Sequence, residues 1–65
     1  MVRFLERRGF VVLRVRGSHH FLGRGDRRTT VPVHGGEALR IGTLRSILRD
    51  IDLPPAEFER LWEID

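Results

Sequence analysis

The chain has 65 residues and no cysteine, so we expect one domain over residues 1–65, with neither disulfide bonds nor a thiolate metal site. Nothing in it resembles a secretory signal. The longest apolar stretch, Phe10 to Leu13, is too short to cross a membrane, so we expect a cytoplasmic protein.

The charge is divided unevenly along the chain. Residues 1–49 carry eleven arginines against three carboxylates, a net charge of +8, whereas residues 50–65 carry one arginine against six carboxylates, a net charge of −5. A basic body with an acidic tail indicates a surface that attracts a polyanion. No lysine is present. Exclusive use of arginine fits two-pronged phosphate recognition, but codon bias in a GC-rich genome explains it equally well.

The first two predicted elements are a short helix and a strand. Residues 1–8 form the helix, with Gly9 as its stop signal. Residues 10–16 are β-branched or aromatic until charges enter at alternate positions, which is typical of a strand. The alternation predicts one face with Val11, Leu13 and Val15 and the other face with Val12, Arg14 and Arg16.

Two further strands follow, each bounded by turn residues. Gly17-Ser18 is a turn, residues 19–22 are a second strand, and residues 23–26 have the composition of a hairpin loop. Residues 28–33 are a third strand. It contains Pro32, which cannot donate to a sheet ladder and therefore predicts an edge strand or a strand end.

The C-terminal half is predicted to be helical. After a loop at residues 34–38, apolar residues recur at helical spacing from residue 39 to residue 51, with Thr43 as a possible cap. Pro54-Pro55 opens a last helix over residues 56–64. The order predicts an α+β domain with helices on one face of a small three-stranded antiparallel sheet.

The chain has three histidines, and they allow structural, metal-binding and catalytic readings. His19 and His20 are adjacent, so on a strand they point to opposite faces and cannot both ligate one ion without distortion. With no cysteine to complete a tetrahedral set, we expect no metal site. The structural reading is the commoner one for a histidine beside a turn, and the catalytic reading depends on its neighbours.

Those neighbours suit RNA chemistry. RNA is cleaved when its own 2′-hydroxyl attacks the adjacent phosphorus, so protons must move and charge on the phosphoryl group must be offset. A histidine can transfer the protons. Arg14, Arg16 and Arg24 can bind the phosphate, Gly17 permits its close approach, and the Ser18 hydroxyl can position it. This reaction needs no metal.

With these residues assembled, the sequence resembles a HicA-type toxin, the mRNA interferase of a bacterial toxin–antitoxin pair. The resemblance covers nearly the whole chain, and its specificity comes from the order and spacing of the motifs. The matching stretches are "RGF" (8–10), "RGSHHF" (16–21), "VPVHGGEAL" (31–39), "GTLRSILRD" (42–50) and "EFERLWE" (57–63).

The resemblance implies an α-β-β-β-α fold like the double-stranded-RNA-binding domain, here with an extra short C-terminal helix. It implies metal-independent cleavage of messenger RNA that inhibits translation, and a HicB-type antitoxin that binds the toxin and blocks its site. The essential histidine falls on His19 or His20, framed by Gly17 and Ser18, and we favour His19 because it directly follows them. His34 is expected to be structural or a substrate contact. Some family members carry a later His-Pro where this chain has Gly23-Arg24, so any role of that histidine is absent.

Two other functions compete with the endoribonuclease. The chain could be a non-catalytic RNA-binding module in which arginines hold phosphates. It could also serve protein interaction, with the face that carries Arg14 and Arg16 docking an acidic partner; in a toxin this coexists with catalysis.

Overall fold

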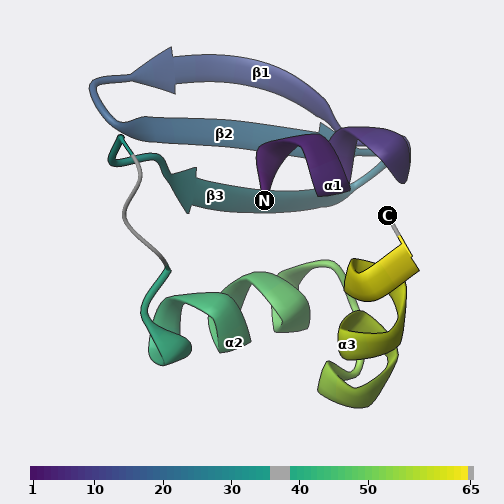
Figure 1. The fold of residues 1–65 in the computed structure, drawn as a ribbon. Coiled ribbons are helices and arrows are strands. Elements are labelled where there is room, and N and C mark those ends of the chain that lie inside the picture. Colours follow the sequence, from purple (N-terminus) through teal and green to yellow (C-terminus); the bar gives the residue numbers. More distant parts are fainter. Residues whose placement is uncertain (36–38, 65) are drawn as a thin grey trace.

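The computed structural model describes residues 1–35 and 39–64 and contains three helices and three strands (Figure 1). The strands form one antiparallel sheet in the order β1-β2-β3. None of the helices in these residues is long and apolar enough to span a membrane. In chain order the elements are α1 (Val2–Arg7), β1 (Val11–Arg16), β2 (His19–Arg24), β3 (Arg27–Pro32), α2 (Ile41–Asp50) and α3 (Pro55–Ile64).

This order confirms the predicted α+β fold, which is like the double-stranded-RNA-binding domain with an added C-terminal helix. The predicted strand end at Pro32 is also confirmed, because β3 is an edge strand and ends there. Residues 36–38 of the predicted loop lie outside the described residues.

The second hairpin is tighter than predicted. Gly23 and Arg24 belong to β2, and the turn consists of Gly25 and Asp26 alone, because Arg24 pairs with Arg27. Gly25 has a φ of 58°, which suits the first position of a two-residue hairpin turn. The longer β2 adds two residues to the central strand of the sheet.

The start of α2 also differs from the prediction. Its N-cap is Arg40, which makes no side-chain capping bond, and Thr43 lies inside the helix. The backbone N–H of Leu44 already donates to the carbonyl of Arg40 at 2.9 Å, so the helix begins about one turn earlier than a Thr43 cap would allow.

A β-bulge at Leu13 overturns the predicted alternation of β1. Val12 pairs with Leu22, yet the next paired residue of β1 is Arg14, opposite Phe21. One extra residue in a strand reverses the face of every residue after it.

Cross-strand partners lie on the same face of a sheet, so the register assigns each strand residue to a face. The helix face packs against the helices and contains the buried residues Leu22, Thr29 and Val31. We call the other face, over which no described helix packs, the open face. Apart from these three, the helix face has Val12, Val15, His20, Arg24 and Arg27; the open face has Val11, Arg14, Arg16, His19, Phe21, Gly23, Arg28, Thr30 and Pro32. Leu13 is unpaired in the bulge, but its Cδ1 lies against Gly23, so it also lies on the open face.

The core lies between the helix face and the helices. Leu22 and Val31 from the sheet join Leu5 of α1, Ile47 of α2 and Phe58 of α3 in one buried cluster. This burial of apolar side chains is the main stabilising contribution available to a chain without disulfides.

An aromatic cluster holds α3 against α1. The ring centroids of Phe4 and Phe58 are 5.2 Å apart in an edge-to-face arrangement, and Trp62 lies 5.5 Å from Phe4 and 5.4 Å from Phe58. Such pairs contribute about 0.5–1.5 kcal/mol each beyond their burial.

Polar contacts fix the end of α2 to β3. The buried Thr29 hydroxyl donates to Asp50 Oδ2 at 3.0 Å, and Arg27 donates to the Asp50 carbonyl at 3.3 Å. Arg27 also forms an ion pair with Asp52 at 3.5 Å. Arg27 is thereby committed to holding the layers together.

Candidate nucleic-acid interface

The turn between β1 and β2 positions the Gly-Ser-His segment. Arg16 and His19 are the last cross-strand pair, so Gly17 and Ser18 alone form the turn. Gly17 has a φ of 59°, and a Cβ added there would meet nothing within 4 Å. The Ser18 carbonyl accepts a hydrogen bond from the Val33 N–H at 2.6 Å, which ties the turn to the end of β3. The turn is therefore anchored on one side and open on the other.

The two adjacent histidines lie on opposite faces, as predicted. His19 is exposed on the open face between its cross-strand partners Arg16 and Pro32. His20 lies on the helix face between Val15 and Val31. Its Nδ1 is buried and has no hydrogen-bond partner among the residues that the structure describes. Of the two histidines, His19 is the more exposed.

Two arginines and an aromatic ring surround His19 on the open face. Arg16 is its direct neighbour on β1, and Phe21 lies two positions further along β2. The guanidinium of Arg14 sits over the Phe21 ring, 4.8 Å from its centroid. No carboxylate occurs in β1, β2 or β3, so the strands supply only positive charge. This combination can bind an anion and transfer a proton beside it.

A third arginine lies at the far end of the open face. A Cβ built on Gly23 would stand 2.8 Å from Leu13 Cδ1 and 2.9 Å from Arg28 Nη1, so both side chains lie across this glycine. The Arg28 guanidinium donates to the Gly25 carbonyl at 2.7 Å and to the Arg27 carbonyl at 2.8 Å. These bonds fix a positive charge at the end of the face opposite His19.

Arg24 is not brought together with the other predicted phosphate-binding residues. It lies on the helix face, five positions from His19 along β2, which corresponds to roughly 17 Å. Its guanidinium donates to the Arg8 carbonyl at 2.6 Å and sits 4.7 Å from the Phe10 ring centroid. Arg24 holds the end of α1 against the sheet, and an RNA contact by this residue stays a prediction.

His34 and its surroundings lie on the other side of the molecule. His34 lines a shallow hollow of about 270 Å³ together with residues of α1 and of the end of β3, among them Val2, Val31 and Val33. Since Val31 is a helix-face residue, this hollow opens on the helix side of the sheet. The structure does not group His34 with the open face.

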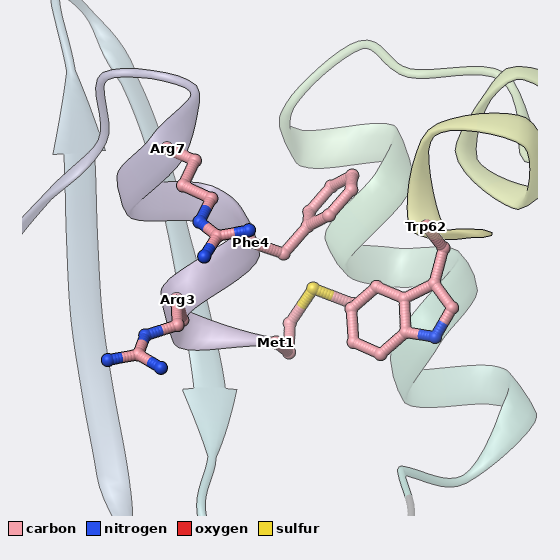
Figure 2. Close-up of a pocket in the computed structure, with 5 residues that line it drawn as sticks. All are labelled: Met1, Arg3, Phe4, Arg7 and Trp62. Atoms are coloured by element: carbon pink, nitrogen blue, oxygen red, sulfur yellow. The ribbon is translucent and has the colours of Figure 1, made fainter. Parts of the chain in front are cut away.

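A separate hollow lies between α1 and α3 (Figure 2). Its volume is about 240 Å³, and Figure 2 shows the guanidinium groups of Arg3 and Arg7 along one wall, with Met1, Phe4 and the Trp62 indole along the other. These side chains include neither an imidazole nor a carboxylate. The hollow therefore lacks a side chain suited to acid–base catalysis near neutral pH.

Two open-face residues, Phe21 and Arg28, are not among the site residues predicted from the sequence. Phe21 shares the spacing of two with His19 that marks one face of a strand, so the signal was present. Arg28 lies on the open face because the second turn consists of Gly25 and Asp26 alone, which makes Arg28 the partner of Gly23. The sequence predicted a longer loop and therefore did not give this register.

Comparison with known proteins places this chain in a family. The family model described as "HicA toxin of bacterial toxin-antitoxin" matches residues 1–53. The chain belongs to the HicA toxin family. Comparisons with curated proteins and with solved structures gave no match.

The family match bears on the partner of this chain and on which part of the fold the family shares. A toxin of a toxin–antitoxin system implies an antitoxin partner. The match includes all three strands and the Gly-Ser-His turn but ends before α3, so α3 with Phe58 and Trp62 lies outside the matched residues. Within the described residues, no three His, Cys, Asp or Glu side chains are grouped as metal ligands would be.

Proposed function

We propose that this HicA-family chain is an endoribonuclease that cleaves messenger RNA without a metal ion and uses His19 to transfer protons. The observation that carries the proposal is the position of His19, exposed on the open face directly beside Arg16. The absence of carboxylates from the three strands favours a polyanionic substrate on that face.

The reaction needs only the RNA and these side chains. The ribose 2′-oxygen attacks the adjacent phosphorus while its proton leaves, and the bond from phosphorus to the 5′-oxygen breaks as that oxygen gains a proton. The products are a 2′,3′-cyclic phosphate and a free 5′-hydroxyl. His19 exchanges a proton at this junction, a contribution worth ~10²–10⁴-fold in rate.

Arginine side chains offset the charge that develops on the phosphoryl oxygens. Arg16 is the nearest cation to His19 in the sheet register, and Arg14 is next along β1. A guanidinium presents paired N–H donors that match two phosphate oxygens. Stabilisation of this kind is often the largest single contribution to catalysis.

The turn contributes access and orientation. Because Gly17 has no Cβ and open space beside it, a phosphate can approach its backbone closely. The Ser18 hydroxyl, directly before His19, can hold a phosphate or ribose oxygen in place. The burial of His20 Nδ1 on the helix face and the greater exposure of His19 support the assignment to His19 rather than His20.

Purified protein incubated with messenger RNA in excess EDTA tests the proposal. We expect cleavage by the wild type and by His20→Ala, and a loss of at least about 100-fold in His19→Ala. Circular dichroism would establish that both variants are folded. Intact RNA in every sample despite tight binding would show a non-catalytic RNA-binding module, and wild-type cleavage by His19→Ala would remove His19 from the mechanism.

We further infer that the partner is a HicB-type antitoxin that places carboxylates against Arg14 and Arg16. An inhibitor that covers a positively charged, phosphate-binding face needs negative charges opposite the arginines. The double variant Arg14→Glu, Arg16→Glu should weaken the complex strongly, whereas the double variant Arg45→Glu, Arg49→Glu on α2 provides a reversal of equal charge away from the open face. Unchanged affinity of the double variant would count against this interface.

A further inference from the structure

The proposed cleavage mechanism assigns no role to Phe21, although this residue lies at the centre of the open face. It pairs with Arg14 on one side and with Thr30 on the other. Its ring is only partly buried, and it lies one same-face step along β2 from His19, roughly 6.6 Å. An aromatic ring in this position is adjacent to the site of proton transfer.

Phe21 and Arg14 form a cation–π contact. The guanidinium carbon of Arg14 lies over the Phe21 ring, 4.8 Å from its centroid, so a cation and an aromatic surface are adjacent here. Nucleobases stack on both kinds of surface in proteins that bind single-stranded nucleic acids. The pair therefore offers both kinds of surface to a base.

The remainder of the face suits an unpaired strand as well. Val11 and Leu13 are more than half exposed, at 56% and 54%, and Arg28 holds a positive charge at the far end. Apolar surface between cations matches bases alternating with phosphates.

We propose that the open face binds single-stranded RNA, with one base stacked on the Phe21–Arg14 pair and the neighbouring phosphate at Arg16 and His19. This inference rests on the proposed function, because the bound strand is the substrate of His19. It makes Phe21 a substrate-binding residue and makes an unpaired nucleotide beside the cleaved bond a requirement.

A duplex does not satisfy the same contacts. In an RNA double helix the bases are already stacked on one another, and proteins recognise it through phosphates and 2′-hydroxyls across the minor groove. Neither an aromatic platform nor exposed valine and leucine gains from such a partner. The fold is like the double-stranded-RNA-binding domain, but the side chains of this face favour a single strand.

Binding of non-cleavable RNA separates this inference from catalysis. The probe is a fluorescent 2′-O-methyl oligoribonucleotide, which has no free 2′-hydroxyl to attack, used as a single strand and as a duplex of the same sequence. We expect the wild-type protein to bind the single strand at least about tenfold more tightly at equal salt. Phe21→Leu should weaken single-strand binding about tenfold, as expected for the loss of one stacked base, and Phe21→Trp should retain it.

Arg45→Ala serves as the matched control for charge, because Arg45 is an exposed arginine of α2 in the helix layer. We expect Arg14→Ala to weaken single-strand binding more than Arg45→Ala does. Equal effects of these two variants, equal binding of duplex and single strand, or wild-type binding by folded Phe21→Leu would each overturn the inference. Cleavage of ordinary RNA by the wild type and by His19→Ala tests the proposed function, whereas binding of the 2′-O-methyl RNA tests this inference without any cleavage, so the two proposals can fail separately.

Discussion

The two faces of the sheet are made from the same three strands and differ in almost every physical respect. On the helix face, Leu22 and Val31 are sealed into the core. On the open face, Val11 and Leu13 remain more than half exposed and arginines flank them. The helices cover the centre of one face, although Val15 at its β1 edge is 53% exposed, and no described helix covers the other face.

The contrast is sharpest along β2, where consecutive residues alternate between the two faces. His19 and Phe21 are on the open face, whereas His20 and Leu22 are on the helix face. Stability should therefore depend on one set of positions and RNA chemistry on the other. Substitutions of neighbouring residues are the most direct way to test this separation.

The largest expected effect is on folding, from Leu22→Ala compared with Phe21→Ala. Leu22 is fully buried, so its truncation should cost about 2–5 kcal/mol in the free energy of unfolding. A domain of 65 residues has roughly 3–10 kcal/mol in total, so this variant should lose a large share of its stability and unfold if the total lies at the low end. Phe21→Ala should cost about 1 kcal/mol or less. Urea denaturation followed by circular dichroism measures both, and similar losses would mean that the faces are not energetically distinct.

The second effect is on cleavage, from Arg16→Ala. Removal of one donor that stabilises a transition-state charge costs roughly 10²–10³-fold in rate, and we expect a loss in this range without loss of fold. Arg16→Lys should recover part of the rate because it restores the charge without the paired donors. Single-turnover cleavage of a labelled RNA measures the effect, with Arg45→Ala as the control. If Arg16→Ala cleaves at a rate within a few fold of wild type, the phosphate does not bind beside Arg16 at the β1–β2 turn.

The order of the elements could be predicted because local signals carry it. Gly9 ends the first helix, Gly17-Ser18 makes the first turn, and the double proline at 54–55 opens the last helix. The opposite orientation of His19 and His20 was likewise available from the alternation of a strand.

The rest depended on contacts between distant parts of the chain. In "VVLRVR" the apolar residues are nearly continuous, so the pattern does not reveal the bulge at Leu13; its position is set by pairing with β2. Arg24 is near His19 in sequence, but the straight strand carries it to the other end and the other face. The packing of Trp62 on Phe4 joins the two ends of the chain, and no local pattern specifies it.

A smaller effect should come from two glycines that resist substitution for different reasons. Gly17→Ala places a side chain at a φ of 59° in open space, so its cost is backbone strain of about 1–2 kcal/mol. Gly17→Asn should cost less, because asparagine tolerates this region. Gly23→Ala instead pushes against Leu13 and Arg28 on the open face. Thermal unfolding should therefore rank Asn above Ala at position 17, and an equal cost for both would contradict backbone strain.

The smallest expected effect on the free energy of unfolding is that of His20→Leu, and it is an increase rather than a loss. His20 has a buried Nδ1 without a partner among the described residues, and an unsatisfied polar atom costs roughly 1–3 kcal/mol. Leucine is apolar and would pack beside Val15 and Val31, the cross-strand neighbours of this position. We therefore expect His20→Leu to stabilise the fold by about 1 kcal/mol while cleavage in EDTA stays at the wild-type rate. His19→Leu is the matched control: it should leave stability within about 0.5 kcal/mol because its site is exposed, and it should abolish cleavage. If His20→Leu destabilises the fold and also loses cleavage, the imidazole of His20 is needed for both. Stability and cleavage would then not be divided between the two faces, even at the adjacent residues His19 and His20.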